Sequence, residues 1–316
     1  MNRERPRAFA ALRVALGTSL SALVFWLILR FIAQSGAAPT AFVPSWALGA
    51  LVLTILQIAV VAARWAFFTR ELGAPLEYRA ALGAYYVSVF LNQLLPLGMI
   101  GDAARGFWHA RRLSATGTER PAFAAASALI LDRASGQLAL LVVALPILPG
   151  WWRPLSAALV TNEPPNGSHL VLVSALMLAA VLGSIFYFGR ALWQRTARAR
   201  GAFFRPNALA VHGAYSLCAL GLHVAAFGCS AHALGFPFSF MIASRVVPLV
   251  LAAASLPSFA FGTGAREASA AALYHLLGLR AADGAAIALA LGLLGFAASL
   301  PGLLLLALAR LRSGAR

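Results

Sequence analysis

The sequence predicts an all-α, polytopic helical membrane protein with about six full spans and two opposed re-entrant hairpins. Hydrophobic residues make up 61% of the 316 residues and charged residues 11%, whereas an ordinary soluble domain has about 25% charged residues. Apolar runs of roughly 17–25 residues recur along the chain, which is the length that crosses a hydrocarbon core of about 30 Å. A single soluble core could not bury so much apolar sequence. We therefore expect one integral membrane domain over residues 1–316.

The positive charge of the chain fits a membrane topology better than a nucleic-acid partner. The net charge is +16, and all 25 basic residues are Arg. They cluster in short loops between apolar runs, as the positive-inside bias predicts. Binding of RNA or DNA would need a basic face on a folded polar domain, and no polar stretch is long enough to form one. We expect no nucleic-acid partner.

Six apolar segments are long enough to cross the membrane. The first follows Arg3, Arg5, Arg7 and Arg13 and therefore imitates a secretory signal. Its apolar run is longer than a typical signal core, so we interpret it as an uncleaved span. The six expected spans lie near 10–32, 46–68, 122–148, 169–189, 208–232 and 284–309.

Two further apolar stretches, near 78–110 and 239–278, are interrupted in their middle by Pro and Gly. Proline removes a backbone donor and disturbs the preceding turn, and glycine permits a sharp bend. Each stretch could therefore be a broken helix or a re-entrant hairpin. The residues expected to break them are Pro96 with Gly101 in the first, and Pro257, Gly262 and Gly264 in the second.

The distribution of Arg favours the hairpins. Eighteen of the 25 Arg lie in five segments: near the N-terminus, from Arg64 through Arg70 to Arg79, at 111–120, at 190–205, and at the C-terminus. These segments are expected to be cytoplasmic, with both termini, in a bacterial inner membrane. The loops near 33–45, 149–168 and 232–239 hold only Arg153 and are expected outside. This alternation requires both interrupted stretches to return to the side they entered from, in opposite directions.

The two interrupted stretches also suggest an internal repeat. In each, the central Pro is followed by Gly at +5 and by Arg at +9. The matched residues are Pro96, Gly101 and Arg105, and Pro257, Gly262 and Arg266. Each half, about 10–148 and 169–310, then has two spans, a hairpin and a span, with the second half starting from the opposite side. Inverted repeats with interrupted helices are a recurrent plan of transporters, so we expect an alternating-access or groove-type protein.

Seven ionisable residues lie within the apolar stretches. Each costs roughly 2.5–3.5 kcal/mol at the centre of a span unless it is paired or hydrated, so we expect them to converge on one another or on a water-filled cavity. Asp102 can pair with Arg105 at i,i+3. Arg266 and Glu267 are adjacent and are expected to seek other partners, for example Asp102 with Arg266. The seven are Asp102, Arg105, Asp132, Arg133, Arg245, Arg266 and Glu267.

Two roles remain open for these charges. In a structural role, ion pairs clamp the two hairpins together. In a binding role, Arg105 and Arg266 sit about one turn inside half-helices whose free N–H groups attract anions, and a guanidinium fork suits a phosphate. Asn92, Gln93 and Thr263 could add hydrogen bonds to such a head group. Asp102, Asp132, Arg133 and Glu267 would then balance charge or couple protons.

The same residues carry a family resemblance. The stretch Asn92-Gln93-Leu94-Leu95-Pro96, with Gly101-Asp102 and Arg105, resembles the N-x-x-x-P…G-D-x-x-R signature of the lysylphosphatidylglycerol synthase transmembrane-region family, which includes the lipid-flipping part of the multiple peptide resistance factor. Departures are a single Gly in Met99-Ile100-Gly101 and the bulky Phe259-Ala260-Phe261. Further agreement, in order along nearly the whole chain, is at Arg64-Trp65, Asp132-Arg133, Leu256-Pro257, Gly262-Thr263-Gly264 and Arg266-Glu267.

The resemblance implies translocation or handling of a membrane lipid, namely an anionic phospholipid, a polyprenyl-linked lipid or a hopanoid species. It does not imply synthesis, because aminoacyl transfer in the two-part relatives resembles the work of a separate soluble domain after the membrane region. The sequence ends at Arg316, so we expect no such domain here. A homo-oligomer is left open.

The sequence also bears on two other classes of function. A membrane-embedded lipid-modifying enzyme would need a Lys-containing phosphatase motif, a His-Glu-x-x-His zinc motif, or acidic outer loops as in a glycosyltransferase. The chain has no Lys, its six His are scattered as core or interfacial residues would be, and its expected outer loops offer only Glu163 and Asp283. We expect no enzyme activity, metal, cofactor or ATP hydrolysis. A transporter of a soluble anion stays open.

Overall fold

The structure, a computed structural model, describes residues 30, 42–95, 100–151, 190, 197–254 and 264–314, and these ranges contain helices and turns but no strand. The expected spans near 10–32 and 169–189 lie outside the described residues. The same holds for four expected site or hairpin residues, Pro96, Pro257, Gly262 and Thr263.

Four helices among the described residues are long and apolar enough to cross a membrane. They fall on the expected segments 46–68, 122–148, 208–232 and 284–309, and these four predictions are confirmed. A helix of 28 residues, such as the first, is about 42 Å long and exceeds the hydrocarbon core. The four are α2 (Pro44–Glu71), α5 (Pro121–Ala144, continued by the 3-10 helix η1, Leu145–Trp151), α9 (Pro206–Ala233) and α12 (Ala281–Gly314).

Both interrupted stretches form two shorter helices each, as expected. Leu95, which ends the first helix, has extended backbone at φ −107° and ψ 146°, because a residue before proline avoids the helical region. Gly264, which precedes the second helix of the second stretch, has φ 93°, a backbone conformation that glycine adopts readily because it has no Cβ. The helices are α3 (Tyr78–Leu94), α4 (Ile100–Ala115), α10 (Phe240–Ala254) and α11 (Ala265–Leu276); a short helix, α8 (Ala197–Phe204), precedes α9.

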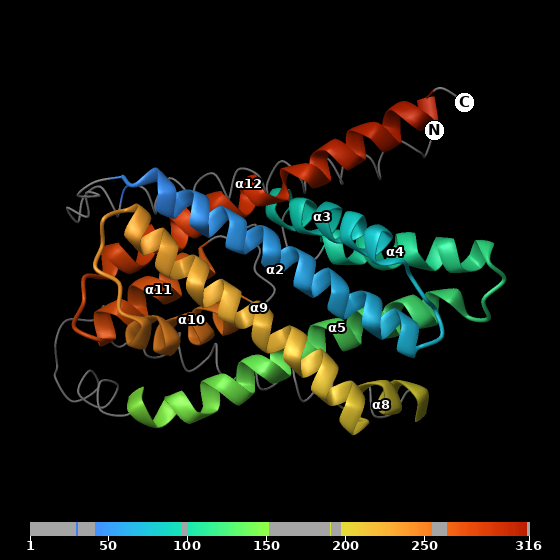
Figure 1. The fold of residues 1–316 in the computed structure, drawn as a ribbon, viewed down its shortest axis with the longest axis horizontal. Coiled ribbons are helices and arrows are strands. Elements are labelled where there is room, and N and C mark those ends of the chain that lie inside the picture. The colour runs from blue at the N-terminus through green and yellow to red at the C-terminus, as the bar shows by residue number, and fades with distance from the viewer. Residues whose placement is uncertain are drawn as a thin grey trace, which may run out of the picture.

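Helices α2 and α9 lie side by side and antiparallel in the middle of the bundle (Figure 1). At one end the Val43 N–H donates to the Ala233 carbonyl at 2.9 Å. At the other end Glu71 pairs with Arg205 at 3.5 Å. The two helices are second in each predicted half, so each half contributes one of the pair.

The contacts among the remaining helices of one half correspond to those of the other half. Helix α3 packs on α4 and on α12 of the other half, and α10 packs on α11 and on α5 of the other half. The contacts of α4 with α5, α2 with α3, α2 with α5 and α2 with α12 likewise match those of α11 with α12, α9 with α10, α9 with α12 and α9 with α5. An internal two-fold repeat requires this correspondence.

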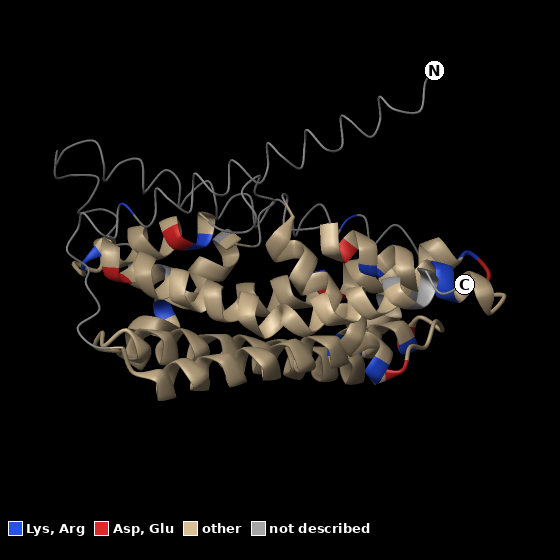
Figure 2. Cartoon of the chain, turned by 90° about the horizontal axis from the view of Figure 1, so that it is seen from above, with Lys and Arg blue, Asp and Glu red and all other residues tan. Residues whose placement is uncertain are grey.

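The described helices form two main apolar cores. Trp65 and Phe68 are fully buried in the core of α2, α3 and α5. Phe227, Val247 and Ile287 are buried in the core of α9, α10, α11 and α12. Figure 2 shows that charged residues lie mostly toward the two ends of the helices, with long uncharged stretches between them. This arrangement is typical of a protein that crosses a bilayer.

Glycine lets α11 and α12 touch at the backbone. An ideal Cβ at Gly284 would stand 2.5 Å from the Ala270 carbonyl oxygen and 2.8 Å from the Tyr274 ring. Small residues at such crossings allow close helix packing in membranes, where dispersion contacts hold helices together. The position of α11 therefore depends on the missing side chain.

We expect Gly284→Ala to lower the stability of the folded protein by about 1–3 kcal/mol, the usual cost of overpacking. The measurement is thermal unfolding of the purified protein in detergent. The matched control is Gly221→Ala in α9, where no atom lies within 4 Å of the ideal Cβ; there the helix propensity of Ala favours the variant by about 0.5–1 kcal/mol. Equal melting temperatures of the two variants would contradict the close contact.

Candidate functional site

The most buried charge of the described chain is the carboxylate of Asp132 on α5, which has no exposed surface. Three groups donate to it. Arg64 Nε of α2 reaches Oδ1 at 2.9 Å, and Tyr85 Oη of α3 reaches Oδ2 at 3.1 Å. Arg105 Nη2 of α4 reaches the same Oδ2 at 3.2 Å. One side chain thus ties together four helices.

The second carboxylate, Asp102 on α4, is equally well partnered. Ser88 Oγ and Arg105 Nη2 each donate to Oδ1 at 3.1 Å. Asn92 Nδ2 donates to Oδ2 at 3.2 Å, and Arg133 Nη2 forms an ion pair with that oxygen. All four carboxylate oxygens of the two Asp are therefore occupied. With Arg64, this cluster of described residues holds three Arg against two Asp and has a surplus of one positive charge.

Arg105 is enclosed. Its side chain has no exposed surface, and its guanidinium carbon lies 4.4 Å from the Trp65 ring centroid and 4.0 Å from that of Tyr85. Two aromatic faces at this distance hold a cation by cation–π attraction. The predicted i,i+3 pair of Asp102 with Arg105 is confirmed. Direct contact of Arg105 with a ligand stays a prediction, and the enclosed geometry favours a role in positioning its neighbours.

Arg133, by contrast, is half exposed, with 46% of its side-chain surface free. It borders a cavity of about 240 Å³ between α2, α3, α5, α9 and α10. Its lining combines polar and apolar side chains. The polar lining comprises Gln57, Arg64, Tyr85, Arg133, Gln137 and Ser216, and the apolar lining includes Val61, Leu140, Leu220 and Leu251. The surplus charge of the cluster is therefore accessible at this cavity.

Arg64 corrects one expectation from the sequence. It was counted among the loop residues that mark the cytoplasmic side, but α2 continues to Glu71 and Arg64 is only 6% exposed inside it. Its Nη1 donates to Ser216 Oγ at 2.9 Å and lies 3.2 Å from the ideal Cβ position of Gly136. Its position inside the apolar segment 46–68 was the signal for a buried role.

A chain of hydroxyl and imidazole groups continues from Arg64, and no motif in the sequence marks these residues. Ser216 Oγ lies 2.8 Å from Ser135 Oγ, and Ser135 Oγ lies 3.0 Å from His212 Nδ1. His212 Nε2 in turn reaches the Phe203 carbonyl at 3.0 Å. His212 is thus a core residue whose two ring nitrogens are both hydrogen-bonded.

The second charged pair lies at the start of α11. Glu267 is 1% exposed, and its Oε2 accepts the Gly264 N–H at 2.6 Å in a capping-box arrangement. Arg266 Nε donates to Glu267 Oε1 at 3.1 Å. The expectation that the two would seek other partners was wrong, because Glu267 turns back toward the helix start and the long Arg266 side chain reaches around to it. The suggested pair of Asp102 with Arg266 is not among the described contacts.

The seven intramembrane charges do not all converge, which corrects a further expectation. Four belong to the Asp132 cluster and two to the Arg266–Glu267 pair, while Arg245 is exposed near the start of α10. A side chain next to each interruption nevertheless contacts the same stretch of α12. The Arg266 guanidinium lies against Gly292, and Gln93 Nε2 lies 3.5 Å from the ideal Cβ of Gly295, three residues and about 4.5 Å along the helix.

Gly101 has a different role from the bend that was expected. It lies in the first turn of α4, where its N–H donates to Asn92 Oδ1 at 2.7 Å. An ideal Cβ there would overlap the Ser88 carbonyl oxygen. Gly101 therefore brings α4 against α3, and this contact places Asp102 beside Ser88 and Asn92.

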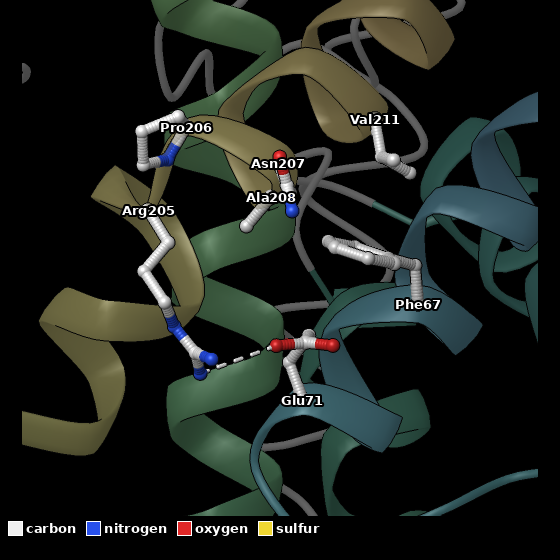
Figure 3. A pocket seen from close by; sticks show the side chains of 7 residues that line it. All are labelled: Phe67, Glu71, Arg205, Pro206, Asn207, Ala208 and Val211. Carbon is white, nitrogen blue, oxygen red and sulfur yellow. Dashed lines mark ion pairs between the residues drawn. The ribbon is translucent and has the colours of Figure 1, made fainter.

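A larger cavity of about 480 Å³ lies outside this cluster, where α2 ends and α9 begins (Figure 3). Arg205 and Glu71 pair across it, with side chains 65% and 29% exposed, and Asn207 and Phe67 line it. Its one lining Arg, Arg205, is already paired with the partly exposed carboxylate of Glu71. The smaller cavity, which holds the surplus charge, is the better candidate site.

Removing the central carboxylate is expected to be severe. Asp132→Ala leaves Arg64 and Arg105 without their shared partner, and breaking a buried pair in this way costs about 3–5 kcal/mol. Thermal unfolding in detergent measures the loss. The control is Glu71→Gln, which breaks the exposed pair with Arg205 and is expected to cost at most about 1 kcal/mol. A melting temperature of Asp132→Ala equal to that of the control would show that the cluster does not stabilise the fold.

Comparison with known proteins agrees with this picture. The sequence model of the family described as lysylphosphatidylglycerol synthase TM region matches residues 12–302. No curated protein and no solved structure matches the chain. The matched range contains the four apolar helices and both charged clusters, so the chain is a multi-pass membrane protein with a lipid-related function. It belongs to the lysylphosphatidylglycerol synthase transmembrane-region family.

Proposed function

We propose that this protein translocates an anionic membrane lipid, and that the lipid head group binds at Arg133. The observation that carries the proposal is the half-exposed guanidinium of Arg133 at the cavity, at the edge of a cluster in which every other charge is buried. The proposal assigns no catalytic step to this chain.

The surplus positive charge of the cluster favours an anionic ligand. Arg133 uses Nη2 for Asp102, and its fork has further N–H donors on Nε and Nη1. Two such donors match two oxygens of a phosphate. A surplus positive charge in apolar surroundings is unfavourable, so a monoanionic head group in the cavity would complete the cluster electrically.

The mixed polar and apolar lining of the cavity favours a lipid over a soluble anion. Leu140, Leu220 and Leu251 form a wall beside the polar groups, and such a wall suits the carbon chain next to a phosphate. The family is lipid-related, which points the same way. A small inorganic anion would gain nothing from the apolar wall.

Arg266 is the proposed second contact. Its side chain is 18% exposed and it lies against α12 at the stretch that Gln93 also reaches. Between the two charged clusters, Gln57 of α2 and His223 of α9 are hydrogen-bonded at 3.1 Å. Arg105 then acts as a positioning residue. Asp102 holds the exposed Arg133 and Glu267 holds the partly exposed Arg266, while Asp132 holds the buried Arg64 and Arg105.

The packing supports an inverted repeat and alternating access. Equivalent helices of an inverted repeat run antiparallel about an axis in the membrane plane, and α2 and α9 are antiparallel neighbours. We propose that α3 with α4, and α10 with α11, are re-entrant hairpins that open the cavity to one side and then to the other. We place both termini on the cytoplasmic side of a bacterial inner membrane.

The test is translocation of a fluorescent phosphatidylglycerol in proteoliposomes, followed by chemical quenching of the outer leaflet. Arg133→Gln and Arg266→Gln are each expected to slow translocation by about tenfold or more, since a lost charge-assisted contact to phosphate costs about 1.5–3 kcal/mol. Arg245→Gln, which removes an exposed Arg of the same chain, is the control and should leave the rate unchanged. A normal rate in Arg133→Gln, with the protein folded and inserted, would end the proposal.

A further inference from the structure

The larger cavity, where α2 ends and α9 begins, has the size and the lining of a ligand site. Its volume of about 480 Å³ lies within the range of roughly 300–1,000 Å³ that is usual for small-molecule sites. Its described lining contains one cation, one anion and one amide beside four apolar residues, and Figure 3 shows these side chains around it. The polar residues are Arg205, Glu71 and Asn207, and the apolar residues are Phe67, Pro206, Ala208 and Val211.

The ion pair of Arg205 with Glu71 leaves hydrogen-bonding capacity unused. Its closest approach, from Nη2 to Oε2, is 3.5 Å, whereas a charge-assisted hydrogen bond is about 2.7–2.9 Å long. Arg205 Nε donates to the Gly201 carbonyl, and the remaining Arg205 donors and Glu71 Oε1 have no hydrogen-bond partner among the described residues. An exposed pair of this kind contributes little to stability, so a ligand can separate the two charges at small cost.

The opposite charges in the lining favour a ligand that carries both signs. An anion at Arg205 alone would also meet the carboxylate of Glu71, and a cation at Glu71 alone would meet the guanidinium. A ligand with a phosphate and an ammonium satisfies both, since the guanidinium fork suits a phosphate and an ammonium donates to a carboxylate. Because the two protein charges are only 3.5 Å apart, a short link must join the phosphate to the ammonium, as in phosphoethanolamine.

The direction of the lining favours a lipid over a soluble zwitterion. Helix α2 is about 42 Å long and the hydrocarbon core is about 30 Å thick, so its last residue, Glu71, lies at the depth of the lipid head groups. Phe67 and Val211 lie four residues, or about 6 Å, further into their helices than Glu71 and Asn207. The charged part of the cavity therefore faces the head-group region, and the apolar part faces the acyl chains.

We infer that this cavity binds a zwitterionic phospholipid of the phosphatidylethanolamine type, with its phosphate at Arg205 and its ammonium at Glu71. The site is separate from the cavity at Arg133 and holds a resident lipid rather than the translocated one, so the inference does not rest on the proposed function. Glu71 ends α2 and Arg205 precedes the first residue of α9. A bound head group would therefore bridge the ends of the two central helices.

The experiment uses a phosphatidylethanolamine with a photoactivatable diazirine near the glycerol end of one acyl chain, added to the purified full chain in detergent. After illumination, peptide mass spectrometry locates and quantifies the crosslinks. We expect them around Phe67 and Val211. Unlabelled phosphatidylethanolamine should compete about fivefold to tenfold better than phosphatidylglycerol, which has the phosphate but no ammonium, because one hydrogen bond has an effect of this size.

Two variants separate the ammonium contact from the phosphate contact. Glu71→Gln should weaken crosslinking of the phosphatidylethanolamine probe about fivefold to tenfold, and should strengthen competition by phosphatidylglycerol because the carboxylate that repels an anion is gone. Arg205→Gln should weaken the binding of both lipids. The matched controls, Glu77→Gln and Arg79→Gln, remove exposed charges at the start of α3, outside the cavity, and should leave crosslinking unchanged.

Several results would overturn the inference. Equal competition by the two lipids in the native protein, or a preference for phosphatidylethanolamine that persists in Glu71→Gln, would remove the ammonium contact. Crosslinks that map away from the end of α2 and the start of α9 would remove the site. Soluble O-phosphoethanolamine is expected to compete at least about tenfold less well than the lipid, because it lacks the apolar chains; equal competition would make the ligand a soluble zwitterion.

Discussion

The arrangement of the site depends on one buried carboxylate. Asp132 has no exposed surface and accepts from Arg64, Tyr85 and Arg105, which come from three other helices. An ion in this environment is tolerable only when it is fully paired, so these contacts fix the rotation of α5 about its axis. Arg133 is the next residue and points about 100° further around the helix, toward the cavity. The ion pairs of Asp132 therefore determine the exposure of Arg133.

Sequence reasoning succeeded where local rules decide. The lengths of apolar runs gave four spans, and the residue before Pro96 is extended, as its neighbour requires. It failed where the outcome depends on the reach of a side chain or on a distant partner. Arg64 was taken for a loop residue although Asp132, 68 positions away, compensates it. The adjacent Arg266 and Glu267 form an ion pair. Their Cα–Cβ bonds point in different directions, but the Arg side chain is long enough to bridge the gap.

The two halves share a packing plan but not a charge pattern. In the first half, two Asp and three Arg form a dense cluster, whereas the second half has the Arg266–Glu267 pair at the start of α11. The guanidinium of Arg105 meets Asp132 on α5, while that of Arg266 meets Gly292 on α12. Because α3 rests on α12 and α10 rests on α5, a movement of either interrupted stretch would change its contacts with the long helix of the other half.

The aromatic faces of Trp65 and Tyr85 that enclose Arg105 have a thermodynamic consequence. A guanidinium that packs against two rings and donates to two carboxylates has little freedom to turn, so the electrostatic potential at the cavity is fixed before any proposed anion arrives. A preorganised site spends little free energy on rearranging itself. Under the proposed transport, neither capture nor release of the anion would need a large rearrangement of the site, which suits a site that must be emptied as often as it is filled.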